Sequence, residues 1–365
     1  MFNFLISDLP FSIVHPTMGY PKYPLKKEIQ MEDLQKQLDL AMAALDKTYG
    51  KNTVIKLGHN HAEQWPSIST GALTLDLALG IGGLPRGRII EIYGPESSGK
   101  TTVALSVIAE AQANGMRCAF LDTEHALDPS YSKMLGVDLD ELIFSQPDYA
   151  EQALEVMDGL LRSNALDVIV LDSVAALVPK AELEGDMGQS HMGLQARLMG
   201  QALRKMVAIA SQNKTMLIFI NQIREKIGVM FGSPETTPGG RALKFYSSVR
   251  LDVRKIATVK NKTTGDVEGV EVKANIVKNK MGPPYRIANF EIVYGKGINN
   301  LGCIFDLAVD KGIFEKSGTW FKYNGEIFAQ GKAKAIEALA SDMELTAQIK
   351  KEIIDGPSVE LLPEV

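Results

Sequence analysis

The chain has few of the features that mark secreted, membrane or strongly basic proteins. Only two of its 365 residues are cysteines, Cys118 and Cys303, and they form no C-x-x-C pair, so neither a disulfide framework nor a cysteine metal site is expected. No apolar run approaches the roughly 18 residues of a membrane span. The formal net charge is -5, so any nucleic-acid binding must come from local patches. We therefore expect a cytoplasmic globular protein with no membrane segment.

Length and patterning predict one large α/β domain with small additions. Residues 1–30 lack the basic start of a signal peptide, and we expect a leader there that is either disordered or the product of a start codon upstream of the native one. Residues 31–61 predict an amphipathic helix and a short strand at 53–57. The core is expected over 62–299, and a small C-terminal α/β domain with a short tail over 300–365. The first helix cannot bury its apolar stripe alone, so it packs either on the main domain or on another subunit.

A glycine-rich phosphate-binding loop at residues 94–101 organises the chain. It matches G-x-x-x-x-G-K-[ST] at every fixed position, after a predicted strand and before a predicted helix. In such a loop the backbone N–H groups face an anion, Lys100 reaches the β and γ phosphates, and the Thr101 hydroxyl binds Mg²⁺. A chance match in a turn is the alternative, and the flanking strand and helix count against it. The expected nucleotide contacts are Gly94, Pro95, Glu96, Ser97, Ser98, Gly99, Lys100, Thr101 and Thr102.

Glu124 follows the predicted strand 116–122. We expect this strand to lie next to the phosphate-loop strand, where α/β sheets place their chemistry. Glu124 is therefore the candidate for polarising an attacking water. A surface carboxylate that caps the helix near Asp128 is the alternative.

Two further predicted strands end in polar residues. Residues 167–172 read as a buried strand of four aliphatic residues closed by Asp172, a Walker B pattern that holds Mg²⁺ through its water shell. Residues 215–220 form a strand followed by Asn221 and Gln222, and a polar side chain at that end is placed to touch a γ-phosphate.

Residues 223–240 predict contacts with single-stranded DNA, and residues 241–280 form a local basic patch. Residues 223–240 interleave Arg224, Lys226 and Phe231 with glycines, which suits phosphate and base contacts; a mobile lid is the alternative. Residues 241–280 hold ten Lys and Arg against four acids on strands that read as antiparallel additions to a parallel sheet. A solvated strand face is the alternative reading of this basic patch.

Seven blocks taken together resemble the bacterial RecA recombinases. The blocks are GPESSGKTT at 94–102, DTEHALDP at 122–129, residues 167–179, FINQIREK at 219–226, MFGSPETTPGG at 230–240, ALKFYSSVR at 242–250 and VKNK at 277–280. The resemblance runs from about residue 31 to about residue 354. It implies a RecA-type P-loop NTPase core with a mostly parallel central sheet, an N-terminal helix-strand polymerisation arm and a small α/β C-terminal domain.

The resemblance also implies residue roles and cofactors. The cofactors are ATP and Mg²⁺, with Asp128 and Tyr131 as adenine contacts and Gln222 coupling the γ-phosphate to DNA. Lys278 and Lys280 would enter the neighbouring subunit's nucleotide site. The implied DNA loops are residues 184–190 and 223–239. The implied DNA contacts are Met192, Arg197, Arg204, Arg224, Lys226 and Phe231, with Arg254, Lys255 and Lys273 at a second site where Asn275 replaces a common basic residue.

The activity that the resemblance implies is that of a DNA-dependent ATPase. Such a protein forms a helical homo-oligomeric filament on single-stranded DNA, pairs it with homologous duplex DNA and exchanges strands. The first helix and Phe245 would pack in the filament interface. A LexA-type repressor, whose self-cleavage the filament stimulates, and filament loaders are further implied partners. A hexameric helicase motor and an ATP-switched scaffold remain alternatives.

Overall fold

The computed structural model describes residues 31–51, 53–55, 65–186, 193–226, 228, 232, 234–261 and 264–356. The chain divides into two compact units, Met1–Glu63 and Gln64–Val365. The predicted leader lies outside the described residues, and the predicted division at residue 300 stays a prediction.

The first unit contains helix α1 (Met31–Tyr49). Its apolar side chains Leu34, Leu38 and Leu45 are exposed by 48%, 48% and 37%. The strand expected at 53–57 is wrong over residues 53–55, which form bends and irregular backbone. A strand requires a hydrogen-bonded neighbour, and an apolar run alone does not supply one.

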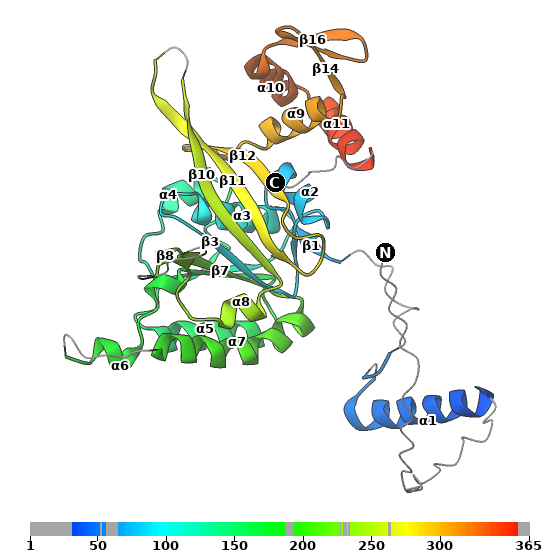
Figure 1. Cartoon of the computed structure of the whole chain (residues 1–365), viewed down its shortest axis with the longest axis vertical. Helices are drawn as coiled ribbons and strands as arrows, with labels where there is room; N and C mark the ends of the chain where they lie inside the picture. The colour runs from blue at the N-terminus through cyan, green and yellow to red at the C-terminus, as the bar shows by residue number, and fades with distance from the viewer. Residues whose placement is uncertain are drawn as a thin grey trace, which may run out of the picture. The chain divides into compact units, whose positions relative to one another are not determined.

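The second unit is built on a nine-stranded sheet with the order β13-β12-β11-β10-β3-β7-β6-β4-β5 (Figure 1). Pairing is parallel from β10 to β5 and antiparallel from β10 to β13. The strands are β3 (Ile89–Gly94), β4 (Cys118–Asp122), β5 (Ile143–Ser145), β6 (Val168–Asp172), β7 (Met216–Gln222), β10 (Val249–Lys260), β11 (Val267–Asn279), β12 (Ile287–Val293) and β13 (Gly297–Ile298).

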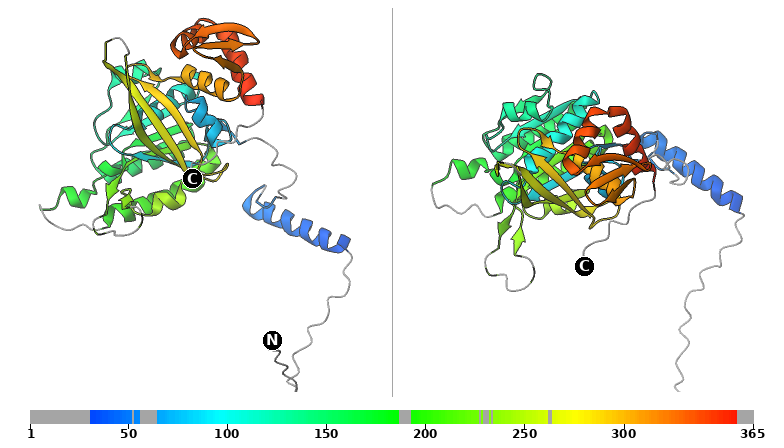
Figure 2. Two further views of the ribbon diagram at one scale, coloured as in Figure 1. Left: turned by 45° about the horizontal axis from the view of Figure 1, so that its top comes forward. Right: turned by 90° about the horizontal axis from the view of Figure 1, so that it is seen from above.

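Helices cover both faces of this sheet (Figures 1 and 2). Successive strand side chains point to opposite faces, so Ile90 packs in one buried cluster while its neighbour Ile89 packs in the other. The first cluster includes residues of α2 (Leu73–Leu79) and α3 (Lys100–Ala113), and the second includes those of α5 (Ala150–Arg162) and α7 (Leu194–Asn213). Continuous aliphatic strands such as β6 are therefore buried on both sides, as parallel sheets require.

Two expectations about the sheet are wrong. The strand before Glu124, β4, does not lie next to β3, because β7 and β6 stand between them. Strand β10 is not wholly an antiparallel addition, because it pairs parallel with β3 and antiparallel only with β11. Strand order depends on how each crossover returns to the sheet, which a local sequence pattern does not encode.

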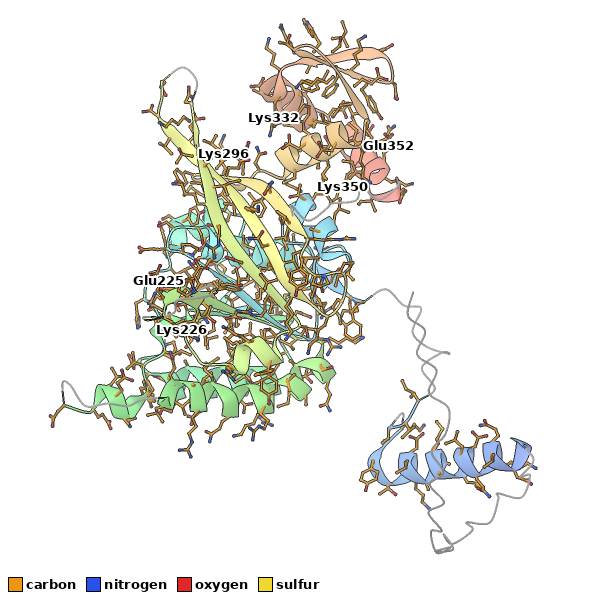
Figure 3. All side chains as sticks on the ribbon, viewed as in Figure 1. Glu225, Lys226, Lys296, Lys332, Lys350 and Glu352 are labelled. Atoms are coloured by element: carbon orange, nitrogen blue, oxygen red, sulfur yellow. The ribbon has the colours of Figure 1, made fainter. Side chains whose placement is uncertain are left out.

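The C-terminal part packs on an aromatic cluster around Phe305. The ring of Phe305 lies 5.6 Å from that of Phe314 and 4.8 Å from that of Phe321, centroid to centroid. Lys332 donates to Asp306 at 2.8 Å and to Glu291 of β12 at 3.4 Å, which ties this part to the large sheet (Figure 3). The elements are α9 (Asn300–Asp310), β14 (Phe314–Ser317), β15 (Trp320–Tyr323), β16 (Glu326–Gln330), α10 (Lys332–Ser341) and α11 (Met343–Asp355).

Short elements complete the described chain. They are β1 (Ser67–Ile68), β2 (Leu84–Pro85), α4 (Pro129–Met134), η2 (Val174–Ala176), α6 (Lys180–Leu183), β8 (Arg224–Glu225), β9 (Glu235–Thr236) and α8 (Ala242–Tyr246). Both cysteines are free and buried, as expected. Among the described helices, none has the length and apolar character needed to cross a membrane.

Asp76 of α2 has a buried side-chain carboxyl group. It is 6% exposed and accepts hydrogen bonds from Ser69 Oγ at 2.6 Å and from Thr70 N and Oγ1 at 2.8 Å each. Burial is the main cause that raises the pKa of Asp76 from 3.8 to about 6, and these hydrogen bonds oppose the shift.

We predict that Asp76→Asn changes how stability depends on pH. The folded protein binds this proton more tightly than the unfolded chain does, so Asp76 lowers stability as pH rises from about 4 to about 6. The unfolding free energy of the variant, relative to the wild type, should therefore rise by up to about 3 kcal/mol between about pH 4 and pH 7. Urea denaturation at several pH values measures this. A difference that stays constant with pH would contradict it.

Candidate functional site

The phosphate loop joins β3 directly to α3 and needs glycine at both fixed positions. A Cβ on Gly94 would stand 2.0 Å from the Val253 carbonyl oxygen, and one on Gly99 would stand 2.5 Å from Ile292 Cδ1. Gly99 has a φ of +93°, in the left-handed region that favours glycine. The hydroxyl of Ser98 is buried with no protein partner among the described residues. An anion accepted by this loop is one group that would satisfy it.

A pocket of about 480 Å³ opens beside the loop. It is lined by Ser97, Ser98, Gly99, Lys100, Thr101, Thr102, Tyr131, Val270, Ile292, Tyr294 and Gly295. Tyr131 reaches the pocket from α4, with its hydroxyl 2.9 Å from Thr102 Oγ1. Asp128 does not line the pocket; its carboxylate accepts from Ser130 N at 2.8 Å and caps α4. The structure thus brings Tyr131, but not Asp128, to the pocket beside the phosphate loop.

Lys100, Thr101 and Asp172 form the polar floor of the site. Lys100 Nζ donates to the Pro95 carbonyl at 2.6 Å, and Thr101 Oγ1 donates to Asp172 Oδ2 at 2.6 Å. Burial lowers the pKa of Lys100, and the charges of Asp172 and Glu124 oppose that shift. Burial likewise raises the pKa of Asp172 to about 6, while the bond from Thr101 lowers it.

The donor set of this floor fits Mg²⁺. A hydroxyl and a carboxylate are the oxygen ligands that Mg²⁺ takes from proteins, and it fills its other positions with water and substrate phosphates. Within the described ranges no group of three or more His, Cys, Asp or Glu could hold a metal ion alone. The Thr101 and Asp172 pair supplies two oxygen ligands and leaves the other positions of a Mg²⁺ ion for water and phosphate oxygens.

Glu124 lies where three strand ends meet. Its Oε1 accepts from Nε2 of Gln222, the last residue of β7, at 2.8 Å, and from the hydroxyl of Ser173, just after β6. The helix cap proposed as its alternative role is made by Asp128 instead. Glu124 is exposed, so a water molecule has access to the carboxylate.

The residues expected to bind single-stranded DNA are exposed where they are described. Arg224 and Lys226 lie on and after β8, and Figure 3 shows Lys226 at the margin of the core. Arg197 and Arg204 are exposed on α7. Met192, Phe231 and residues 187–190 of the first loop lie outside the described residues.

The second expected loop ends at contacts with the start of α7, which is itself bonded to the segment after β6. Gln195, in the first turn of α7, donates to the carbonyls of Val174 and Leu177 at 2.8 and 3.0 Å. Its Oε1 accepts from Gly239 N at 3.1 Å, at the end of the second loop. The end of the second loop is thereby attached to the segment that follows Asp172.

The expected second DNA site contains acids that neutralise part of its charge. Arg254 and Lys273 stand opposite each other on β10 and β11. Arg254 forms ion pairs with Glu235 at 2.5 Å and with Asp252 at 3.0 Å. Asn275 stands opposite Asp252. The sequence count of ten basic residues against four acids overstated the local charge, because Glu235 comes from outside that range.

Lys278 and Lys280 do not line the pocket of their own chain. Lys278 Nζ donates to the carbonyls of Lys244 at 2.7 Å and Phe245 at 3.1 Å, at the end of α8. Lys280 is exposed, and the Phe245 side chain is 70% exposed. Lys278 and Phe245 are thus in contact with each other, and neither they nor Lys280 line the pocket beside the phosphate loop.

Sequence reasoning missed Ser173 and the acid Glu91. Glu91 is fully buried in β3, where it pairs with Arg250 at 2.5 Å and accepts from Asn221. A lone acid inside an apolar strand was the available signal, because a buried carboxylate requires a partner.

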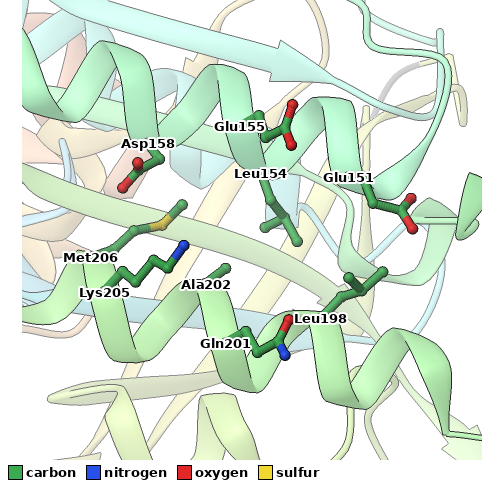
Figure 4. A pocket seen from close by; sticks show the side chains of 9 residues that line it. All are labelled: Glu151, Leu154, Glu155, Asp158, Leu198, Gln201, Ala202, Lys205 and Met206. Carbon is green, nitrogen blue, oxygen red and sulfur yellow. The ribbon is translucent and has the colours of Figure 1, made fainter.

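A second pocket lies between α5 and α7 (Figure 4). Asp158 on α5 stands across from Lys205 and Met206 on α7. None of the expected site residues lines this pocket, and it plays no part in the nucleotide site.

Comparison with known proteins agrees with this geometry. The RecA N-terminal domain family model matches residues 36–299, and the RecA C-terminal domain model matches residues 302–356. The chain is 58% identical over 320 residues to a protein named Protein RecA from Acinetobacter baylyi, covering 87% of this chain and 91% of that protein. It is 58% identical over 324 residues to Protein RecA of Mycolicibacterium smegmatis, covering 89% and 92%. The chain belongs to the RecA family of DNA recombinases.

Proposed function

We propose that this chain is an ATP-hydrolysing recombinase that assembles as a helical filament on single-stranded DNA in the cytoplasm. The filament pairs the bound strand with homologous duplex DNA and exchanges strands in recombinational repair. The observation that carries the proposal is the contact of Glu124 with both Gln222 and Ser173, next to the Thr101 and Asp172 pair. A hexameric motor and a scaffold without strand exchange are not favoured for a member of this family.

The residues in and around the pocket have separate roles in phosphoryl transfer. The loop N–H groups and Lys100 bind the phosphates, and Tyr131 contacts the base end of the pocket. Mg²⁺ held at Thr101 and Asp172 would neutralise phosphate charge. Glu124 orients a water and accepts its proton. In the protomer the side-chain amide of Gln222 donates to Glu124 at 2.8 Å. A bound γ-phosphate competes with Glu124 for this amide. Nucleotide binding therefore moves the end of β7, which leads into the second DNA loop.

The site is completed by a second copy of the chain. Lys278 and Lys280 supply cations to the adjacent protomer's phosphates, which requires Lys278 to leave the carbonyls of Lys244 and Phe245. The apolar stripe of α1 and the exposed Phe245 supply the contacts between protomers. Because the donor and acceptor surfaces differ, the contact is heterologous and extends into a filament. A LexA-type repressor and filament loaders are further partners of this assembly.

We predict that Glu124→Gln lowers DNA-stimulated ATP hydrolysis by about 10²- to 10⁴-fold, because the amide cannot accept the water's proton. Filament formation should persist, since the amide keeps a hydrogen-bonding group beside Gln222 and Ser173. Phosphate release and electron microscopy of the filaments measure the two properties separately. Glu141→Gln, at an exposed acid away from this site, is the matched control and should change neither. Undiminished ATP hydrolysis by the Glu124→Gln variant would show that Glu124 is not the base that accepts the water's proton.

We predict that Arg224→Ala and Lys226→Ala each reduce the salt dependence of single-strand binding. Loss of one phosphate contact should lower the slope of log K against log salt by about 0.7. Fluorescence anisotropy of a labelled oligonucleotide over a salt series measures it. Lys351→Ala, at an exposed lysine of α11, should leave the slope unchanged. If the Arg224 and Lys226 variants keep the wild-type slope, neither side chain contacts phosphate.

We predict that two inactive variants restore activity to each other. Lys100→Ala lacks the phosphate-binding lysine, and the double variant Lys278→Ala, Lys280→Ala lacks the cations donated to a neighbour. In a randomly mixed filament about a quarter of the interfaces combine an intact loop with intact donated lysines. ATP turnover of the mixture should approach that share of the wild-type rate, while each variant alone stays inactive. A mixture no more active than its components would place these lysines outside the shared site.

A further inference from the structure

We propose that the buried hydrogen bond between Glu91 and Asn221 is a positioning contact that couples the nucleotide site to the second DNA loop. The inference rests on the proposed function, because it concerns how ATP binding changes affinity for single-stranded DNA. Neither residue touches a nucleotide or DNA in this scheme, and both act through Gln222 and through the end of the loop.

Asn221 has its side-chain hydrogen bonds distributed over three segments. Its Nδ2 donates to Glu91 Oε1 of β3 at 3.1 Å and to the Pro238 carbonyl at 3.1 Å. Its Oδ1 accepts from the backbone N–H of Gln222 at 3.0 Å. A side-chain amide has two N–H donors, and both are used here. Asn221 therefore fixes the backbone of Gln222 and the last residues of the second loop at the same time.

Glu91 holds Asn221 in this orientation. Glu91 and Asn221 are each 0% exposed, and Arg250 Nε donates to the second carboxylate oxygen of Glu91 at 2.5 Å. The Arg250 guanidinium also stacks over the ring of Tyr93, 4.6 Å from its centroid. Tyr93 precedes the first residue of the phosphate loop. The network thus runs from the phosphate-loop strand through Glu91 and Asn221 to the DNA loop.

The loop end has little freedom to move independently of this contact. Gly239 N donates to Gln195 Oε1, and a Cβ on Gly239 would stand 2.9 Å from Val174 Cγ1. A Cβ on Gly240 would stand 2.7 Å from Ala196 Cβ. Residues 238–240 are therefore packed between Asn221 on one side and the start of α7 on the other. A shift of the β7 end at Gln222 displaces Pro238 through the shared side chain of Asn221.

Stability alone gives a weak reason for an ion pair at this position. Well-packed apolar residues of similar volume commonly stabilise a core as well as a buried ion pair does. The other buried side chains of β3 are those of Ile89, Ile90 and Ile92, so an apolar side chain would suit the sheet. The carboxylate of Glu91 is instead bonded to Asn221, which bridges Gln222 and Pro238.

The test measures affinity for fluorescein-labelled oligo(dT) with a non-hydrolysable ATP analogue and with ADP. In the wild type the ratio of these affinities should fall in the roughly 5- to 150-fold range of allosteric coupling. Glu91→Gln and Asn221→Ala should each bring the ratio close to one while binding of a fluorescent ATP analogue without DNA is unchanged. A Gln at position 91 has one acceptor oxygen, which the Arg250 guanidinium takes, so its NH2 group faces Nδ2 of Asn221 and the bond is lost. The double variant should lose no more than either single variant, because both changes break one link.

Asp76→Asn is the matched control, since it also exchanges a buried carboxyl for an amide in the same unit, and it should keep the wild-type ratio. All assays are run well below the lowest measured unfolding midpoint. If Glu91→Gln does not fold, Asn221→Ala decides, because it leaves the Glu91 and Arg250 pair intact. A folded variant that keeps the wild-type ratio overturns the inference, as does a variant whose affinities fall equally with both nucleotides. A wild type with no nucleotide-dependent ratio overturns the proposed function itself.

Discussion

Parallel pairing of β3, β7, β6 and β4 is the constraint on which the nucleotide site depends. Parallel strands end at the same edge of a sheet, and neighbouring strands lie about 4.8 Å apart. In the observed register Gly94 stands opposite Gln222, and Asp122 stands opposite Asp172. The loop that follows each strand therefore starts within reach of the next one. Thr101, Asp172, Glu124 and Gln222 converge there although they are spread over about a third of the chain.

This convergence has an electrostatic cost that suits the chemistry. Asp172 and Lys100 are 7% and 9% exposed, and burial disfavours the charged form of both. The pKa of Asp172, raised to about 6, still leaves a carboxylate at neutral pH, and the Thr101 hydroxyl stabilises it by a hydrogen bond. A cation bound together with the phosphates would offset the free-energy cost of burying the Asp172 carboxylate. The pocket is thus arranged for a charged ligand rather than for an apolar one.

Sequence patterns predicted the parts of this site that depend on local structure. The phosphate loop required glycines at positions 94 and 99, and the clashes that a Cβ would cause there explain why the pattern is readable. Buried parallel strands ending in a polar residue located Asp172 and Gln222. The strand order was mispredicted, and the Glu91 and Arg250 pair was missed, because both depend on which segments meet after the chain has crossed the sheet. The ion pair between Arg254 and Glu235 was not predicted either, because these residues come from segments that meet only in the folded chain.

The surface around α8 links catalysis to assembly in physical terms. Phe245 exposes most of an aromatic side chain, and Lys278 donates to the carbonyl of that same residue. Covering Phe245 with another copy would remove apolar area from water, a contribution of about 25 cal/mol per Å². It would also change the surroundings of the carbonyls that hold Lys278. Since burial lowers the pKa of Lys278 where it now lies, transfer of its ammonium group to a phosphate-rich site favours the charged form. In the proposed filament, assembly and completion of the nucleotide site would therefore involve the same few atoms of α8 and β11, and a protomer alone would carry only part of that site.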